Sequence, residues 1–177
     1  MKGIFILILI IVIQFDVHSQ NISAGVGVGT GLLIFEDDTE NGFGLDFYLD
    51  AALSRTYTVE IRPGFYGANN YVGAEFGSYL KLFPFNNTFF FITGLDLHFN
   101  QSGGGISSIN REELFILPTI GLGFKGLGII HKVLNIELVY QKPFPNGLTY
   151  AIVGNESHYK NDFLGIINLN IAFIWQL

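Results

Sequence analysis

Three neighbouring residues in a polar stretch after residue 141 have the side-chain types of a hydrolase: Glu156, Ser157 and His158. Hydrolysis by such a set requires a serine nucleophile, a histidine base and a carboxylate that orients the base. Adjacent residues of one loop cannot be assumed to converge in that geometry. The sequence therefore favours a non-enzymatic protein, and a hydrolase that acts on membrane lipid is the enzymatic alternative.

Other cofactor and partner chemistry is not indicated. His98, His131 and His158 lie in three separate segments without the spacing of a metal site. The chain contains no cysteine, which excludes disulfides, thiol nucleophiles and thiolate ligands. A net charge of -6, with basic residues scattered singly, argues against nucleic acid, which requires a basic surface. The sequence predicts no metal, no cofactor and no nucleic-acid partner.

Ten ionisable residues lie in segments where polar and bulky apolar residues alternate. A period of two places such residues on one face of a β-strand, with the apolar residues on the other. If that face is enclosed, the charges could form a proton relay or an ion path, or they could pair and fill the interior. The ten residues are Asp46, Asp50, Glu60, Arg62, Glu75, Lys81, Asp96, His98, Lys125 and Glu137.

The elements that must position these residues are strands, because no segment after residue 20 has a helical period. The alternation predicts eight of them, separated by turn-forming residues. Their expected ranges are 22–35, 42–54, 56–66, 71–82, 89–100, 114–125, 133–141 and 163–176.

The volumes of the side chains indicate which face of these strands is inside. One face carries mainly Phe, Leu and Ile, whereas the other is rich in glycine, as in Gly25, Gly27, Gly29 and Gly31. The interior of an eight-stranded barrel is only wide enough to be filled by side chains, so the small and polar face must be the inner one. The apolar face would then form a belt too large for a water-soluble monomer, and lipid is its natural solvent. A soluble lipocalin-like ligand-binding barrel, with the apolar face inward, is the less favoured alternative.

A closed barrel of this size leads us to expect paired charges that plug the lumen. The short connection between the fourth and fifth strands would place Glu75 opposite His98. That between the second and third strands would place Arg62 diagonal to Asp46 and Asp50. The sequence thus favours the ion-pair interpretation over a proton relay or an ion path.

The connections differ in length in a way that orients the barrel. Those after the second, fourth and sixth strands are short, and those after the first, fifth and seventh are longer or more polar. The connection after the third strand, "GANN", is an exception because it is also short. Short periplasmic turns and longer outer loops are typical of outer-membrane barrels, and an even strand number puts both termini on the short-turn side. We expect the acidic cluster at residues 36–40 (Glu36, Asp37, Asp38, Glu40) to be a solvated outer loop. Phe144, Tyr150 and Tyr159 could make the longest loop adhesive.

Residues 1–19 have the features of a cleaved secretory signal peptide. Lys2 precedes an apolar run from Ile4 to Ile13, which is too short for a membrane helix, and Ser19 suits the cleavage position. The expected organisation is therefore a signal peptide at 1–19 and one β-barrel domain at 20–177.

The final strand, "LNIAFIWQL", carries Ile171, Phe173, Trp175 and Leu177 on one face. Together with the Gly-rich "AGVGVGTG" first strand and the eight alternating segments, it resembles the OmpA/OmpX-like outer-membrane β-barrel domain family. The resemblance implies a monomeric barrel in the outer membrane of a Gram-negative cell, in contact with outer-membrane lipid and lipopolysaccharide. It further implies that these four residues form a C-terminal signal for the outer-membrane assembly machinery, and that the role is in membrane integrity or adhesion. The His-x-Ser strand motif that we associate with lipid deacylases of this architecture is missing.

Overall fold

A computed structural model describes residues 22–36, 38–68, 71–85, 88–101, 112–126, 132–144 and 163–177. It has eight strands: β1 (Ile22–Phe35), β2 (Thr39–Ala52), β3 (Tyr57–Gly67), β4 (Val72–Phe85), β5 (Phe89–Gln101), β6 (Glu112–Lys125), β7 (Lys132–Gln141) and β8 (Phe163–Gln176). Within the described part of the chain there is no helix long and apolar enough to cross a bilayer. The segment expected to be a signal peptide, residues 1–19, lies outside the described residues.

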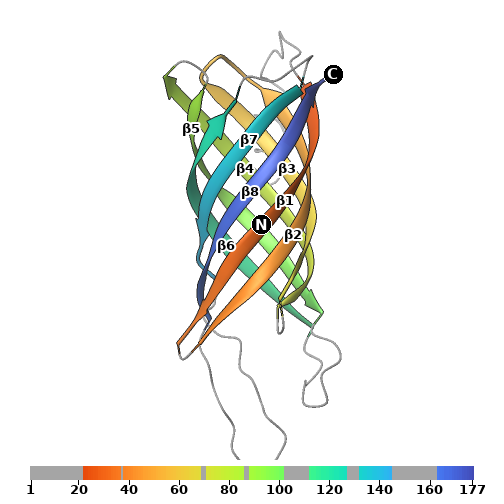
Figure 1. Ribbon diagram of the computed structural model, residues 1–177, viewed down its shortest axis with the longest axis vertical. Helices are drawn as coiled ribbons and strands as arrows, with labels where there is room; N and C mark the ends of the chain where they lie inside the picture. Colours follow the sequence, from red (N-terminus) through yellow and green to blue (C-terminus); the bar gives the residue numbers. More distant parts are fainter. Residues whose placement is uncertain are drawn as a thin grey trace, which may run out of the picture.

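The eight strands form one closed barrel in which every strand pairs antiparallel with its neighbours in the sequence (Figure 1). β8 closes the barrel against β1, with Phe173 opposite Val26 and Trp175 opposite Ala24. Closure leaves no strand edge unpaired, which is the condition for a sheet in contact with hydrocarbon. The predicted all-β, eight-stranded, up-and-down architecture is confirmed.

The predicted strand bounds differ from the observed ones by at most three residues. One consequence is a correction to the acidic cluster, which was expected to be a loop. Glu40 lies within β2, opposite Leu33 of β1, because the β1–β2 hairpin is tighter than its composition indicates. Glu36 and Asp38 are exposed at that hairpin, and Asp37 is outside the described residues.

The barrel is inverted relative to a water-soluble protein. Phe47, Ile120 and Leu138 on the outer face are 50%, 62% and 53% exposed, whereas Glu60 and Lys81 inside are 0% and 1% exposed. Such an exterior is stable only against hydrocarbon, since water would solvate the charged groups and not the rings. The orientation inferred from side-chain volume is therefore the observed one.

Glycine lines the inner face where large side chains need space. A Cβ atom at Gly27 would lie 2.8 Å from the Cβ of Ala172 and 2.8 Å from the ring of Tyr48. A Cβ at Gly77 would lie 2.6 Å from Cζ of Tyr79. Because neither site can hold a methyl group without displacement of a neighbour, the glycines allow these two tyrosines to lie across the lumen.

The sequence led us to expect an interior filled by glycines and charged side chains. The structure also places apolar side chains inside the barrel. At the end with the β1–β2, β3–β4, β5–β6 and β7–β8 connections, eight buried residues form the loop-end cluster: Leu33, Phe35, Tyr66, Tyr71, Phe115, Leu117, Phe163 and Ile166. Two smaller clusters, around Phe90 and Ile174, occupy the interior towards the end with the short turns. Polar side chains are thus concentrated in the middle of the lumen, between apolar ends.

Candidate functional site: the polar network of the lumen

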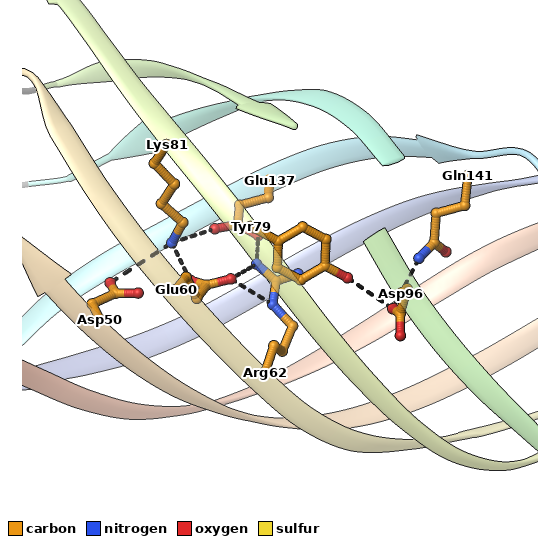
Figure 2. A network of polar contacts seen from close by, with 8 residues as sticks. All are labelled: Asp50, Glu60, Arg62, Tyr79, Lys81, Asp96, Glu137 and Gln141. Carbon is orange, nitrogen blue, oxygen red and sulfur yellow. Dashed lines mark hydrogen bonds and ion pairs between the residues drawn. The ribbon is translucent and has the colours of Figure 1, made fainter. Parts of the chain in front are cut away.

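The centre of the lumen holds two buried cations and three carboxylates, the central cluster (Figure 2). Arg62 donates through Nε to Oε1 of Glu60 at 2.8 Å, and its Nη2 lies 2.5 Å from Oε2 of Glu137. Lys81 Nζ lies 3.0 Å from Oε1 of Glu137 and 3.7 Å from Oδ2 of Asp50, and it also contacts Oε2 of Glu60. Each cation therefore joins carboxylates from at least two strands.

These contacts connect opposite walls of the barrel. Glu60 and Arg62 lie two residues apart on the inner face of β3, Lys81 follows on β4, and Glu137 projects from β7. In an eight-stranded barrel β3 and β7 face each other across the lumen. The ion pairs therefore close the lumen at this level, and buried pairs with this many partners resist separation.

Aromatic rings surround the two cations. The Arg62 guanidinium lies 4.3 Å from the centroid of the Tyr48 ring and 4.6 Å from that of Tyr79, so it is held between two tyrosines. Lys81 Nζ lies 5.1 Å from the centroid of Phe90. Contact with ring faces stabilises cations that are screened from water.

A second group of hydrogen bonds is built on Asp96, which is 3% exposed. Tyr79 donates its hydroxyl to Oδ2 of Asp96 at 2.7 Å, and Gln141 donates Nε2 to the same oxygen at 3.1 Å (Figure 2). Asn168 donates to Gln141 at 2.8 Å, and Tyr66 donates to Asn168 at 3.1 Å. These hydrogen bonds connect Asp96 on β5 to Gln141 on β7, then to Asn168 on β8 and finally to Tyr66 on β3.

These neutral residues were not predicted as site residues, because charge was the criterion applied to the sequence. Tyr66, Tyr79, Gln141 and Asn168 alternate with apolar residues in the same period of two as the charged ones. That period was the signal that could have found them.

The third group contains Glu75 and His98, which the register places opposite each other, as predicted. Oε1 of Glu75 lies 2.9 Å from Nδ1 of His98 and accepts a hydrogen bond from the Tyr71 hydroxyl at 3.3 Å. His98 Nε2 lies 3.3 Å from Oδ1 of Asn100. The Tyr71 ring stacks on the His98 ring, with centroids 3.5 Å apart.

The predicted register of Arg62 is confirmed, but the ion-pair partners that it suggested and the expected position of Lys125 need correction. Arg62 is diagonal to Asp46 and Asp50 in the β2–β3 register, but its ion pairs are with Glu60 and Glu137. Its long side chain extends across the lumen, which a rule for neighbouring strands cannot describe. Lys125 is exposed at the end of β6 and has no ion pair with a described residue. Its Nζ lies 5.8 Å from the Phe83 ring centroid.

Asp46 is the lumen carboxylate with the fewest polar contacts. It is 8% exposed and lies opposite Gly64, yet it has no hydrogen bond or ion pair with any described residue. Among the side chains that the structure describes, the lumen contains six carboxyl groups, of Asp46, Asp50, Glu60, Glu75, Asp96 and Glu137, against two permanent cations, Arg62 and Lys81. The two cations therefore cannot compensate all six carboxyl groups if every one of them is ionised.

The other candidate residues are less informative. Among the described residues, no three histidine or carboxylate side chains are grouped so that they could hold a metal ion. Glu156, Ser157 and His158 lie outside the described residues, as do His131, Tyr150 and Tyr159. Phe144 pairs with Ile116 and is 67% exposed.

The residues of the C-terminal motif lie mainly on the outer face of β8. Ile171, Phe173 and Leu177 are exposed and Trp175 is half-buried. The Leu177 amide donates to the carbonyl of Ile22 at 2.9 Å, which extends the β1–β8 pairing to the last residue. The motif thus lies on the strand that closes the barrel, at the end with the short turns.

No protein-family model matches the chain, and no curated protein matches it in sequence. Solved structures do match in fold. The N-terminal β-barrel domain of Pseudomonas aeruginosa OprF is similar with a TM-score of 0.52, over 85% of this chain and 97% of that one, at 12% identity. Neisserial surface protein A (NspA) is similar with a TM-score of 0.58, over 89% and 98%, at 9% identity.

At these identities the likeness establishes the fold alone. Together with the apolar exterior, that fold defines the class: a small eight-stranded β-barrel with the architecture of outer-membrane proteins. The location predicted from the sequence, the bacterial outer membrane, agrees with this class.

Proposed function

We propose that the protein is a non-enzymatic, monomeric component of the outer membrane whose role is structural or adhesive, with a lumen that stays closed. The observation that carries this proposal is the set of ion pairs that joins β3 and β4 to β7 across the lumen. Because all the charged groups involved are buried, opening an ion path would require several pairs to separate at once. The barrel itself would then serve to hold the loops at the membrane surface.

The partners follow from the exterior and from the ends of the barrel. Outer-membrane lipid would contact the apolar belt, and lipopolysaccharide would surround the half of the belt towards the loop end. The exposed face of β8, with Phe173, and the following residue Leu177 would bind the outer-membrane assembly machinery. The loop end would face outward and present the surface for adhesion.

Topology can be tested cleanly because the chain contains no cysteine. Glu36→Cys places a thiol at the β1–β2 hairpin, and Arg55→Cys places one at the β2–β3 turn. Both positions are exposed, at opposite ends of the barrel. We expect a membrane-impermeant maleimide to label Glu36→Cys on intact cells and Arg55→Cys only after permeabilisation. The reverse pattern, or recovery of the protein in the aqueous fraction, would reject the proposal.

Closure of the lumen is tested by conductance in planar bilayers. The purified barrel should give no steady conductance, whereas a channel would give one that changes in Glu137→Gln. The enzymatic alternative has its own test, which is release of acyl chains from outer-membrane lipid. Such an activity, if abolished by Ser157→Ala, would replace the structural role with a catalytic one.

A further inference from the structure

The hydrogen bonds around Asn100 fix the orientation of its side-chain amide. The backbone N–H of Val72 donates to Oδ1 of Asn100 at 3.0 Å, so this atom must be the carbonyl oxygen. A flipped amide would place an NH2 group against the Val72 N–H, and two donors cannot form a hydrogen bond. Oδ1 is therefore an acceptor for any second neighbour.

That second neighbour is Nε2 of His98, at 3.3 Å. Since Oδ1 only accepts, Nε2 must carry a proton. The other ring nitrogen, Nδ1, lies 2.9 Å from Oε1 of Glu75. A carboxylate anion and an unprotonated nitrogen would repel at this distance, so a proton must lie between them.

We propose that Glu75 and His98 form a proton-binding site that holds one proton between Oε1 and Nδ1 at neutral pH, and that this proton fixes Tyr71 and with it the loop-end cluster. An exposed glutamate is ionised and an exposed histidine is mostly neutral at pH 7, so the separated residues would lack this proton. His98 is 0% exposed, which makes water an unavailable replacement.

The link to the loop-end cluster is Tyr71. Its hydroxyl donates to the same Oε1 atom of Glu75, and its ring stacks on His98. The ring also lies 5.9 Å from that of Phe115 and 5.4 Å from that of Phe163, centroid to centroid. If the proton is lost, the His98 ring must turn away from Glu75, and Tyr71 loses its stacking surface.

The described residues around Glu75 and His98 do not offer an unpaired cation that could compensate an ionised Glu75 carboxylate. Asp46 on β2, Asp96 on β5 and Tyr66 on β3 are acidic or neutral neighbours, and Tyr79 lies further along β4. The Arg62 guanidinium is already paired with Glu60 and Glu137. Of the β6 side chains that the structure describes, Phe115 lies near the pair, with its ring centroid 6.4 Å from that of His98. A proton is therefore the simplest compensation for Glu75.

The protonation state can be read directly by NMR of the full barrel in lipid nanodiscs at pH 7. The carbon of the Glu75 carboxyl group and both ring nitrogens of His98 are observed, with His98→Gln and Glu75→Gln assigning the signals. We expect either a protonated carboxyl with one ring proton on Nε2, or an ionised carboxylate with both nitrogens protonated. An ionised carboxylate beside a singly protonated ring, or protons on all three positions, would overturn the proposal.

The link to the loop-end cluster is tested by hydrogen exchange of the Val72 amide, whose acceptor is Asn100. Glu75→Gln keeps the shape, and its NH2 group can donate one hydrogen to Nδ1 and the other to the Tyr71 hydroxyl, which then accepts instead of donating. Exchange should therefore stay close to that of the unmodified protein. Glu75→Ala removes the donor and should accelerate exchange by about tenfold, as expected for loss of roughly one hydrogen bond. Equal exchange in the two variants would show that the proton does not hold the cluster.

Discussion

Replacement of Lys81 by methionine removes one of the two cations of the central cluster at nearly constant side-chain length. Lys81 is 1% exposed, and its Nζ contacts carboxylates of Asp50, Glu60 and Glu137. Three carboxylates now share two cations, so the formal charge of the cluster is -1. In the variant the formal charge of the cluster becomes -2, and water cannot reach the cluster to solvate the additional negative charge.

Removal of one partner from a buried ion pair destabilises proteins by about 3–5 kcal/mol, because the remaining charge is left uncompensated. We expect Lys81→Met to lower the free energy of unfolding by that amount. Glu137→Gln should have a smaller effect, about 1–3 kcal/mol, since Arg62 keeps Glu60 and Lys81 keeps Glu60 and Asp50. In the double variant the charge returns to -1, so its loss should be smaller than the sum of the two single losses.

The assay is unfolding in denaturant of the barrel reconstituted in lipid vesicles. Trp175 is the single tryptophan of the chain and lies on β8 opposite Ala24 of β1, so its fluorescence reports barrel closure. Lys142→Met, at an exposed lysine, is the matched control and should change stability by less than about 0.5 kcal/mol. If Lys81→Met is as stable as this control, or if the two central variants are simply additive, the central cluster is not the coupled unit described above.

Three further outcomes follow from the same fold. Leu138→Arg puts a charge on the lipid-facing side of β7 and should destabilise the barrel by about 2–4 kcal/mol in vesicle unfolding, whereas Leu138→Phe should be nearly neutral. Gly27→Val would force Ala172 or Tyr48 to move and should cost about 1–3 kcal/mol by the same assay, compared with no significant change for Val28→Ile on the outer face. If the C-terminal motif acts in assembly, Phe173→Ala should reduce the heat-modifiable, folded fraction in cells but leave refolding in detergent unchanged; a defect in both would indicate a structural role alone.

The sequence predicted the barrel well because lipid imposes a strict alternation on every strand. All eight strands and the face of each polar residue follow from a period of two, and the Glu75–His98 pairing follows from one short turn. A β-bulge shows where the rule ends. The β1–β8 register shifts between the pairs Ile34–Gly165 and Phe35–Phe163, and next to this shift two successive residues, Gly165 and Ile166, are buried.

The candidate site was harder to predict because its contacts cross the lumen. Glu137 and Arg62 are 75 residues apart and belong to strands that are not neighbours, so no local pairing rule joins them. The same limitation hid the loop-end cluster: Phe35, Phe115 and Phe163 have the residue type of the outer face but lie inside. Residue type alone cannot distinguish a ring that faces lipid from a ring that closes the end of a barrel.

One carboxyl group of the lumen, that of Asp46, has no hydrogen bond or ion pair with a described residue. Arg62 and Lys81 serve Asp50, Glu60 and Glu137, His98 shares a proton with Glu75 in the arrangement inferred above, and Tyr79 and Gln141 donate to Asp96. Asp46 has no such donor among the described residues, although it is nearly as buried as the others. Burial of an unpaired polar group is unfavourable by about 1–3 kcal/mol.

Asp46→Asn should therefore stabilise the barrel, in contrast to Glu137→Gln in the central cluster. We expect the free energy of unfolding in vesicles to rise by up to about 2 kcal/mol, because the amide has nearly the same shape and no charge to bury. Asp96→Asn is the matched control. It should be destabilising, since Asp96 accepts two hydrogen bonds that favour the carboxylate. If Asp46→Asn is destabilising to the same degree, Asp46 has a partner outside the described residues, and the lumen is better compensated than its described contacts indicate.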